Sequence, residues 1–140
     1  MKEFFFILSE VIFSKKNMIK KLSFNFGELS IYDNYVLAVM KEGVTISPNY
    51  NDVLVDISET YFRNKNFIYI THRIHSYTVD PQIYYKTEKI ENLIGFAVVS
   101  HNYQAKLNAQ IEKMFFKKPL MIFSDIEEAI TWALKVTKTN

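Results

Sequence analysis

The sequence has no cysteine, only three glycines and three prolines, and no long uninterrupted apolar run. Without cysteine there are no disulfides, thiolate nucleophiles or zinc–thiolate sites. The absence also fits a protein kept in a reducing compartment, so we expect a cytoplasmic location. So few glycines exclude a glycine-rich phosphate cradle and a G-x-S-x-G nucleophile turn.

The sequence also has no large excess of positive or negative charge. Seventeen basic and fifteen acidic residues give a formal net charge of +2. Binding to the phosphate backbone of a nucleic acid usually requires a concentrated basic stripe. We therefore expect no nucleic-acid partner.

Apolar residues are abundant: 49% of the 140 residues are hydrophobic and 16% are aromatic. This composition predicts a folded chain with one core. We assign residues 18–140 to a single α/β domain and residues 1–17 to an apolar amino-terminal extension. The run Phe4–Phe13, interrupted by Glu10, is about half of the ~20 residues that a membrane-spanning helix needs. The extension could dock on its own domain or a neighbour, contact a membrane, or precede a translation start at Met18.

The order of the predicted elements indicates a mixed sheet flanked by helices. Alternating apolar and polar residues from Ile19 to Met40 predict two or three antiparallel strands with one solvated face. Three short apolar runs follow, at residues 67–70, 93–99 and 120–123, each leading into a helix-like segment. Short continuous apolar runs are typical of strands buried on both faces, as in a parallel sheet covered by helices.

The intervening helices are predicted from caps and apolar stripes. Ser47-Pro48 and Asp80-Pro81 resemble helix starts, and Ser124 with Glu127 has the spacing of a capping box. For the helix that begins near Asn102, we expect an apolar stripe to face the core; its members are Leu107, Ile111, Met114 and Phe115.

Polar side chains gather at the carboxyl ends of the three apolar strands, which share one edge in a parallel sheet and commonly meet ligands there. The candidate binding edge consists of His72, Arg73, His75, Ser100, His101 and Ser124. We expect the first strand to continue to Ile74, so that His72 and Arg73 point to opposite faces. Ser76 and Thr78 would then lie in the strand–helix loop 75–80, where they either favour an anion beside a helix start or stabilise the turn locally.

Neither a metal site nor a catalytic set is expected. His72 and His75 are three residues apart on a predicted strand, so their rings diverge, and no carboxylates with ligand spacing lie nearby in the sequence. A serine hydrolase would have to combine a histidine with Ser76 or Ser100 and with Asp80. We expect no cofactor, no metal and no enzymatic activity.

Two stretches resemble a known group. The ending Phe123-Ser124-Asp125-Ile126-Glu127-Glu128-Ala129-Ile130-Thr131-Trp132-Ala133, and the S-Y-x-V-D-P core of residues 76–81, are similar to segments of small STAS-type proteins of the SEC14-like, uncharacterised bacterial branch. The fold of this group is that of the anti-sigma-factor antagonists (SpoIIAA-like). The resemblance covers roughly residues 22–136.

The resemblance implies a signalling or protein-binding module rather than an enzyme. In the antagonists, a serine at the start of the helix after a central strand is phosphorylated, and the matching position here is Ser76, with Thr78 second. The usual D-S-[ST]-G-[LV] sequence is replaced by His75-Ser76-Tyr77-Thr78-Val79. Related sheets in lipid-transfer proteins bind acyl chains, so a binder of a lipid or another apolar ligand is the alternative. We expect a protein partner or self-association, with membrane or lipid contact as the alternative.

Overall fold

A computed structural model describes the backbone of residues 2–138 and the side chains of residues 8–138. Its strands are β1 (Lys20–Phe24), β2 (Gly27–Ile31), β3 (Tyr35–Met40), β4 (Thr45–Ile46), β5 (Phe67–His72), β6 (Thr78–Val79), β7 (Leu93–Val99) and β8 (Leu120–Phe123). Its helices are α1 (Lys2–Lys16), α2 (Asn51–Tyr61), α3 (Ile83–Thr87), α4 (Tyr103–Lys113) and α5 (Ile126–Lys138), with a 3-10 turn η1 (Pro48–Tyr50) before α2.

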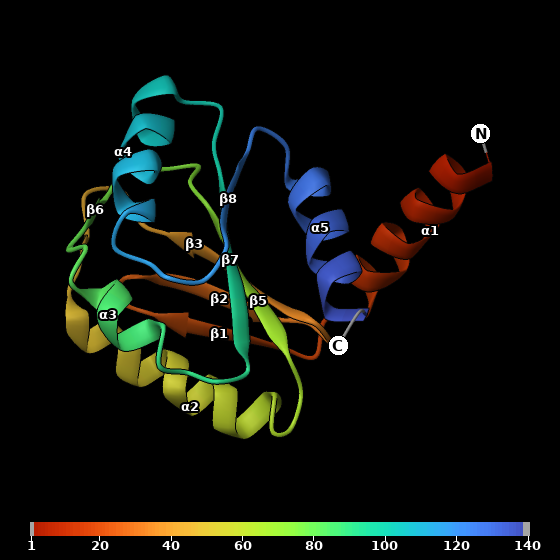
Figure 1. The fold of residues 1–140 in the computed structure, drawn as a ribbon, viewed down its shortest axis with the longest axis horizontal. Coiled ribbons are helices and arrows are strands. Elements are labelled where there is room, and N and C mark those ends of the chain that lie inside the picture. Colours follow the sequence, from red (N-terminus) through yellow and green to blue (C-terminus); the bar gives the residue numbers. More distant parts are fainter. Residues whose placement is uncertain (1, 139–140) are drawn as a thin grey trace.

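Six strands form one mixed sheet in the order β1-β2-β3-β5-β7-β8. The first three are antiparallel neighbours, and the pairs β3–β5, β5–β7 and β7–β8 are parallel. Helices α2, α3 and α4 lie on one side of the sheet, and α5 with α1 lies on the other (Figure 1). The predicted fold class, antiparallel amino-terminal strands followed by strand–helix units in a sheet flanked by helices, is confirmed.

The central strands are buried on both faces because helices cover both. Along β5, Phe67 and Tyr69 join the core beneath α2 and α3, whereas Ile68 and Ile70 join the core beneath α5. This alternation follows from the two-residue period of a strand. Continuous apolar runs in the sequence therefore identified these strands correctly.

Helix α5 approaches the sheet closely at Gly95 of β7. A Cβ atom at this position would lie 2.9 Å from both Ile68 Cδ1 and Trp132 Cη2. The missing side chain thus makes room for the indole of α5 against the sheet. A glycine inside a strand often marks such a close approach.

Two local predictions are wrong. Strand β5 ends at His72 rather than Ile74, because the Ile74 N–H turns back to the His72 carbonyl at 2.9 Å. The segment after it is not a simple strand–helix loop: Thr78 and Val79 form β6, which pairs in parallel with β4 in a separate two-stranded sheet. The predicted helix start at Asp80-Pro81 is supported in part: the Asp80 carboxylate accepts the Gln82 N–H at 3.0 Å in a turn that leads into α3, and α3 itself begins at Ile83.

The predicted orientation of α4 is also wrong. Leu107 and Ile111 were expected in the core, yet both side chains are exposed, and Ala109 and Glu112 are buried in their place. The buried carboxylate of Glu112 has a partner in the sheet, and this partner determines which side of the helix faces inward.

Helix α1 covers residues 2–16 of the predicted extension, and its second half packs on the main body. Val11 is buried in the α5-side core, and the Ser14 hydroxyl donates to the Tyr35 hydroxyl at 3.1 Å. Lys15 forms an ion pair with Glu127 of α5 at 2.6 Å. The side chains of Phe4–Ile7, the first part of the apolar run, lie outside the described residues.

Candidate functional site

The carboxyl end of β5 sends consecutive side chains to opposite faces of the sheet, as the sequence predicted. His72 is half-buried on the α5 side, where its neighbours include His101, Glu127 and Lys15. Arg73 points to the other side, toward α4. The predicted binding edge is therefore divided between two environments.

Arg73 is inside the protein, not on the edge where we expected it. Its guanidinium donates two hydrogen bonds to the carboxylate of Glu112 on α4, at 2.8 and 2.6 Å. The two side chains are only 7% and 9% exposed. Bidentate, charge-assisted hydrogen bonds of this kind are among the strongest hydrogen bonds in proteins.

Two tyrosines complete the surroundings of this ion pair. The Tyr84 hydroxyl of α3 donates to Glu112, and the Arg73 guanidinium lies 5.3 Å from the centre of the Tyr77 ring. Burial raises the pKa of both tyrosine hydroxyls, so both remain neutral near neutral pH. The cluster links β5, α3 and α4, the three elements that converge at this end of the sheet.

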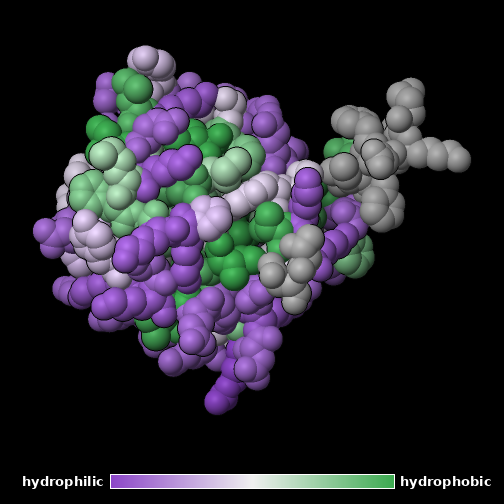
Figure 2. All heavy atoms as spheres, in the orientation of Figure 1, coloured by the Kyte–Doolittle hydropathy of each residue, from purple (hydrophilic) through white to green (hydrophobic). Residues whose placement is uncertain are grey.

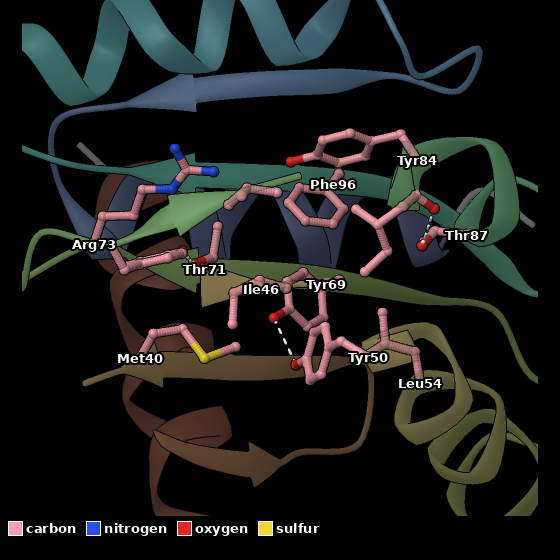
Figure 3. A pocket seen from close by; sticks show the side chains of 13 residues that line it. Met40, Ile46, Tyr50, Leu54, Tyr69, Thr71, Arg73, Tyr84, Thr87 and Phe96 are labelled. Atoms are coloured by element: carbon pink, nitrogen blue, oxygen red, sulfur yellow. Dashed lines mark hydrogen bonds between the residues drawn. The ribbon is translucent and has the colours of Figure 1, made fainter. Parts of the chain in front are cut away.

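A small cavity lies next to the cluster, between the sheet and the helices α2 and α3. Figure 3 shows the side chains around it, including the hydrogen-bonded pair Tyr50 and Tyr69, whose hydroxyl oxygens are 2.8 Å apart. The cavity measures about 20 Å³, which is room for a single water-sized group. An acyl chain does not fit inside it.

The histidines are only partly brought together. His101 is close enough to His72 to lower the pKa of His72, and His101 Nε2 lies 3.9 Å from Asp125 Oδ1. His75 instead lies near Glu42, with Nδ1 3.8 Å from its carboxylate. Residues 8–138 contain no group of three side chains placed to hold a metal ion.

His72 has an unusual electrostatic environment. Partial burial, followed by the nearby His101, lowers the pKa of His72, and Lys15 acts in the same direction. The Glu127 carboxylate opposes the shift. His72 is consequently neutral in the folded protein at pH values where a free histidine begins to protonate.

The two candidate phosphoacceptors are exposed, in surroundings that the sequence did not predict. The Ser76 backbone N–H donates to the carboxylate of Glu42 at 2.9 Å, and Thr78 belongs to β6. Neither residue begins a helix. A phosphate on Ser76 would meet the negative charge of Glu42, while Arg73, the cation expected beside it, is paired with Glu112.

Ser100 and Ser124 have local hydrogen bonds. The buried Ser100 hydroxyl accepts the Asn102 N–H at 3.0 Å, and the Ser124 hydroxyl accepts a hydrogen bond from Lys106 of α4 at 2.5 Å. These contacts fix the start of α4 and its position against the loop before α5. We assign the two serines to this positioning, which leaves His101 as the exposed member of the edge on this side.

Three of the four residues in the predicted stripe, Leu107, Ile111 and Met114, are exposed, and the fourth, Phe115, packs partly buried against the core. Helix α4 and its C-cap residue Met114 therefore present an apolar stripe to solvent, consisting of Tyr103 (75% exposed), Leu107 (40%), Ile111 (57%) and Met114 (83%). Figure 2 shows hydrophobic side chains among hydrophilic ones at the upper left, the region where α4 lies in Figure 1. We call these four residues the α4 stripe.

Comparisons with known proteins provide limited information. No protein-family profile matches the sequence, and a search of curated proteins gives no match. A solved structure of an uncharacterised DUF3478-family protein with a SpoIIAA-like fold, from Shewanella loihica PV-4, matches with a TM-score of 0.46 and 9% identity, over 81% of this chain and 90% of that one. It names the fold group that the sequence motifs resemble. A TM-score this low carries no argument about this chain, so its function is argued from its own residues.

Proposed function

We propose that this chain is a non-enzymatic protein-interaction module that binds a partner protein through the α4 stripe. One observation carries the proposal: α4 exposes its largest apolar residues and buries a glutamate. A contiguous exposed apolar patch commonly marks an interaction site. Side chains spaced three and four residues apart, as in this stripe, suit packing against another helix.

The charges around the stripe favour an acidic partner. The acidic residue of α4, Glu112, is buried in the pair with Arg73, whereas Lys113 is exposed. The nearby Lys117 is also exposed, and its ammonium lies 3.9 Å from the carboxylate of Glu88. Lys113 therefore makes this end of the stripe positive. Complementary charges at a rim steer association and set specificity, so we expect the partner segment to be an amphipathic helix with acidic flanks.

The hydrogen bonds of the candidate catalytic groups support a non-enzymatic role. A hydrolase would need Ser76 or Ser100, a histidine and Asp80 in one constellation. Ser100 is buried and accepts the Asn102 N–H, and the Asp80 carboxylate accepts the Gln82 N–H. These contacts serve the local turns. The cytoplasmic location remains a prediction from the sequence.

Site-specific photocrosslinking tests the proposal. A photoreactive residue at Leu107 is expected to give a discrete adduct in the native cell, and Ile111→Asp is expected to abolish it. The matched control carries the photoreactive residue at Glu59, an exposed position on α2. Equal adducts at both positions, or no adduct at Leu107, would contradict the proposal. An adduct of twice the chain mass would identify a second copy as the partner.

We also propose that modification of Ser76 or Thr78 regulates this module. Their exposure supports access by a kinase, and the link between Ser76 N–H and Glu42 supplies the contact that a phosphate would disturb. Phosphorylation would add roughly 1.5–2 negative charges beside that carboxylate. Mass spectrometry of protein from native cells tests this idea, and unmodified residues under every growth condition would refute it.

A further inference from the structure

Helix α1 carries a second exposed apolar surface, at the opposite side of the molecule from α4 (Figure 1). Phe13 is 70% exposed, and Leu8 and Ile12 are also open to solvent. The sequence continues the apolar character toward the amino end with Phe4-Phe5-Phe6-Ile7. We propose that α1 binds the protein to the surface of an anionic lipid bilayer, independently of the function proposed for α4.

The contacts of α1 hold two of its polar side chains, Glu10 and Ser14, against the body. Glu10, the acidic residue that interrupts the apolar run, forms an ion pair with Lys138 of α5. Ser14 is hydrogen-bonded to Tyr35, and Val11 is buried on the same side. The exposed part of α1 carries the apolar side chains Ile12 and Phe13 together with Ser9 and Lys16. Packing thus leaves Ile12 and Phe13 open to solvent beside a lysine.

The lysines at the carboxyl end of α1 favour binding to an anionic surface. Four lysines are exposed there: Lys15, Lys16, Lys20 and Lys21. The Glu127 carboxylate is paired with Lys15, and Glu28 is paired with Lys21 at 3.0 Å. Apolar side chains followed closely by lysines match the chemistry of a lipid surface, where anionic headgroups lie directly above the acyl chains.

Helix α1 is too short to span a bilayer, and its length suits binding at the bilayer surface. Fifteen residues make a helix of about 22 Å at 1.5 Å per residue, shorter than the ~30 Å hydrocarbon core of a bilayer. Within residues 2–138, no helix has the length and apolar content to cross a membrane. The exposed residues Met18 and Ile19, directly after α1, extend the apolar surface next to the lysines.

Vesicle co-sedimentation of the full chain tests this inference. We compare vesicles of phosphatidylcholine with vesicles that contain about one third phosphatidylglycerol. The wild-type protein is expected to sediment with the anionic vesicles at low salt and to be released when the salt rises from about 0.05 M to about 0.5 M, because the Debye length shortens. Ile12→Ser with Phe13→Ser is expected to lower the partition coefficient at least about tenfold.

Matched variants on α4 separate this inference from the proposed function. Leu107→Ser with Ile111→Ser removes two exposed apolar side chains elsewhere, and Lys113→Glu with Lys117→Glu reverses two exposed charges elsewhere. Both are expected to bind vesicles like wild type, whereas Lys16→Glu with Lys20→Glu is expected to abolish binding. Equal loss in the α4 variants, binding to neutral vesicles alone, or concentration-dependent dimers without vesicle binding would each overturn the inference.

Discussion

Arg73 at the end of β5 and Glu112 on α4 form a buried ion pair with two hydrogen bonds, of 2.8 and 2.6 Å, across 39 positions of sequence. Burial alone disfavours a charged guanidinium, but the bonds to Glu112 outweigh it and raise the pKa of Arg73. This pair determines the rotation of α4 and, with it, which residues of α4 reach solvent.

Removing one partner of the pair is expected to be costly. Glu112→Leu leaves the guanidinium of Arg73 buried without its counter-charge, and we expect a loss of about 3–5 kcal/mol in the free energy of unfolding. Arg73→Met with Glu112→Leu removes both charges and is expected to lose much less. Urea unfolding of the single and double variants measures this. Additive losses would show that the ion pair contributes no coupling energy.

The outward orientation of α4 predicts a contrast between identical substitutions. Leu54→Ala in α2 removes a core side chain and is expected to cost about 2–5 kcal/mol. Leu107→Ala in α4 removes an exposed one, and we expect a change within about 0.5 kcal/mol. The pair Ile57→Ala and Ile111→Ala repeats the comparison. A core-like loss at Leu107 or Ile111 would mean that α4 faces inward with its apolar side.

The lowered pKa of His72 predicts that the stability of the protein depends on pH near neutrality. Because its pKa is lowered in the folded protein, the unfolded chain binds a proton first as the pH falls below about 6.5. Stability therefore falls with pH between the ordinary histidine pKa and the lowered one.

Thermal unfolding between about pH 5.5 and about pH 7.5 measures this dependence on both sides of the ordinary histidine pKa. His72→Gln is expected to flatten the dependence, and His75→Gln, at an exposed position beside Glu42, serves as the control. An unchanged slope in the His72 variant would contradict the assignment. The range avoids the Glu127 carboxylate, because the hydrogen bond from Lys15 lowers the pKa of Glu127.

The close packing at Gly95 predicts that a larger residue there will displace Trp132 of α5. A methyl group at Gly95 would stand 2.9 Å from both Trp132 and Ile68, so Gly95→Ala must displace the indole and the Ile68 side chain. We expect a loss of about 1–3 kcal/mol. Trp132 is the single tryptophan of the chain, so its fluorescence should shift in the same variant. Unchanged emission and stability would show that the α5 interface tolerates the added volume.

The tyrosine at the α1 contact gives a spectroscopic test of that docking. Burial raises the pKa of Tyr35 to about 12, against the hydrogen bond with Ser14, which lowers it. Ser14→Ala removes this opposing contact, so we expect the ionisation of Tyr35 to move to still higher pH. Alkaline titration by ultraviolet absorbance, with Tyr35→Phe to assign the transition, measures the change. A downward shift would indicate that α1 detaches and water reaches Tyr35.

The sequence by itself determined the layered architecture, because local patterns encode burial on one or both faces of an element. The run Leu93–Val99 matches β7, and Leu120–Phe123 matches β8. The opposite directions of His72 and Arg73 also followed from the strand period. These features depend on residues that are close together in the sequence, so the local pattern of apolar and polar residues is enough to predict them.

Only the tertiary structure decided the orientation of α4 and the location of Arg73. By its apolar pattern alone, α4 should bury Leu107 and Ile111, yet a buried guanidinium on a distant strand requires a carboxylate and receives Glu112. Leaving that charge unpaired would cost about 3–5 kcal/mol. Burying two more aliphatic side chains would gain about 3–6 kcal/mol, which is of the same order, so the pair with Glu112 can offset the exposure of Leu107 and Ile111. Arg73 and Glu112 are 39 residues apart in the sequence. No local sequence pattern could therefore predict that they form an ion pair.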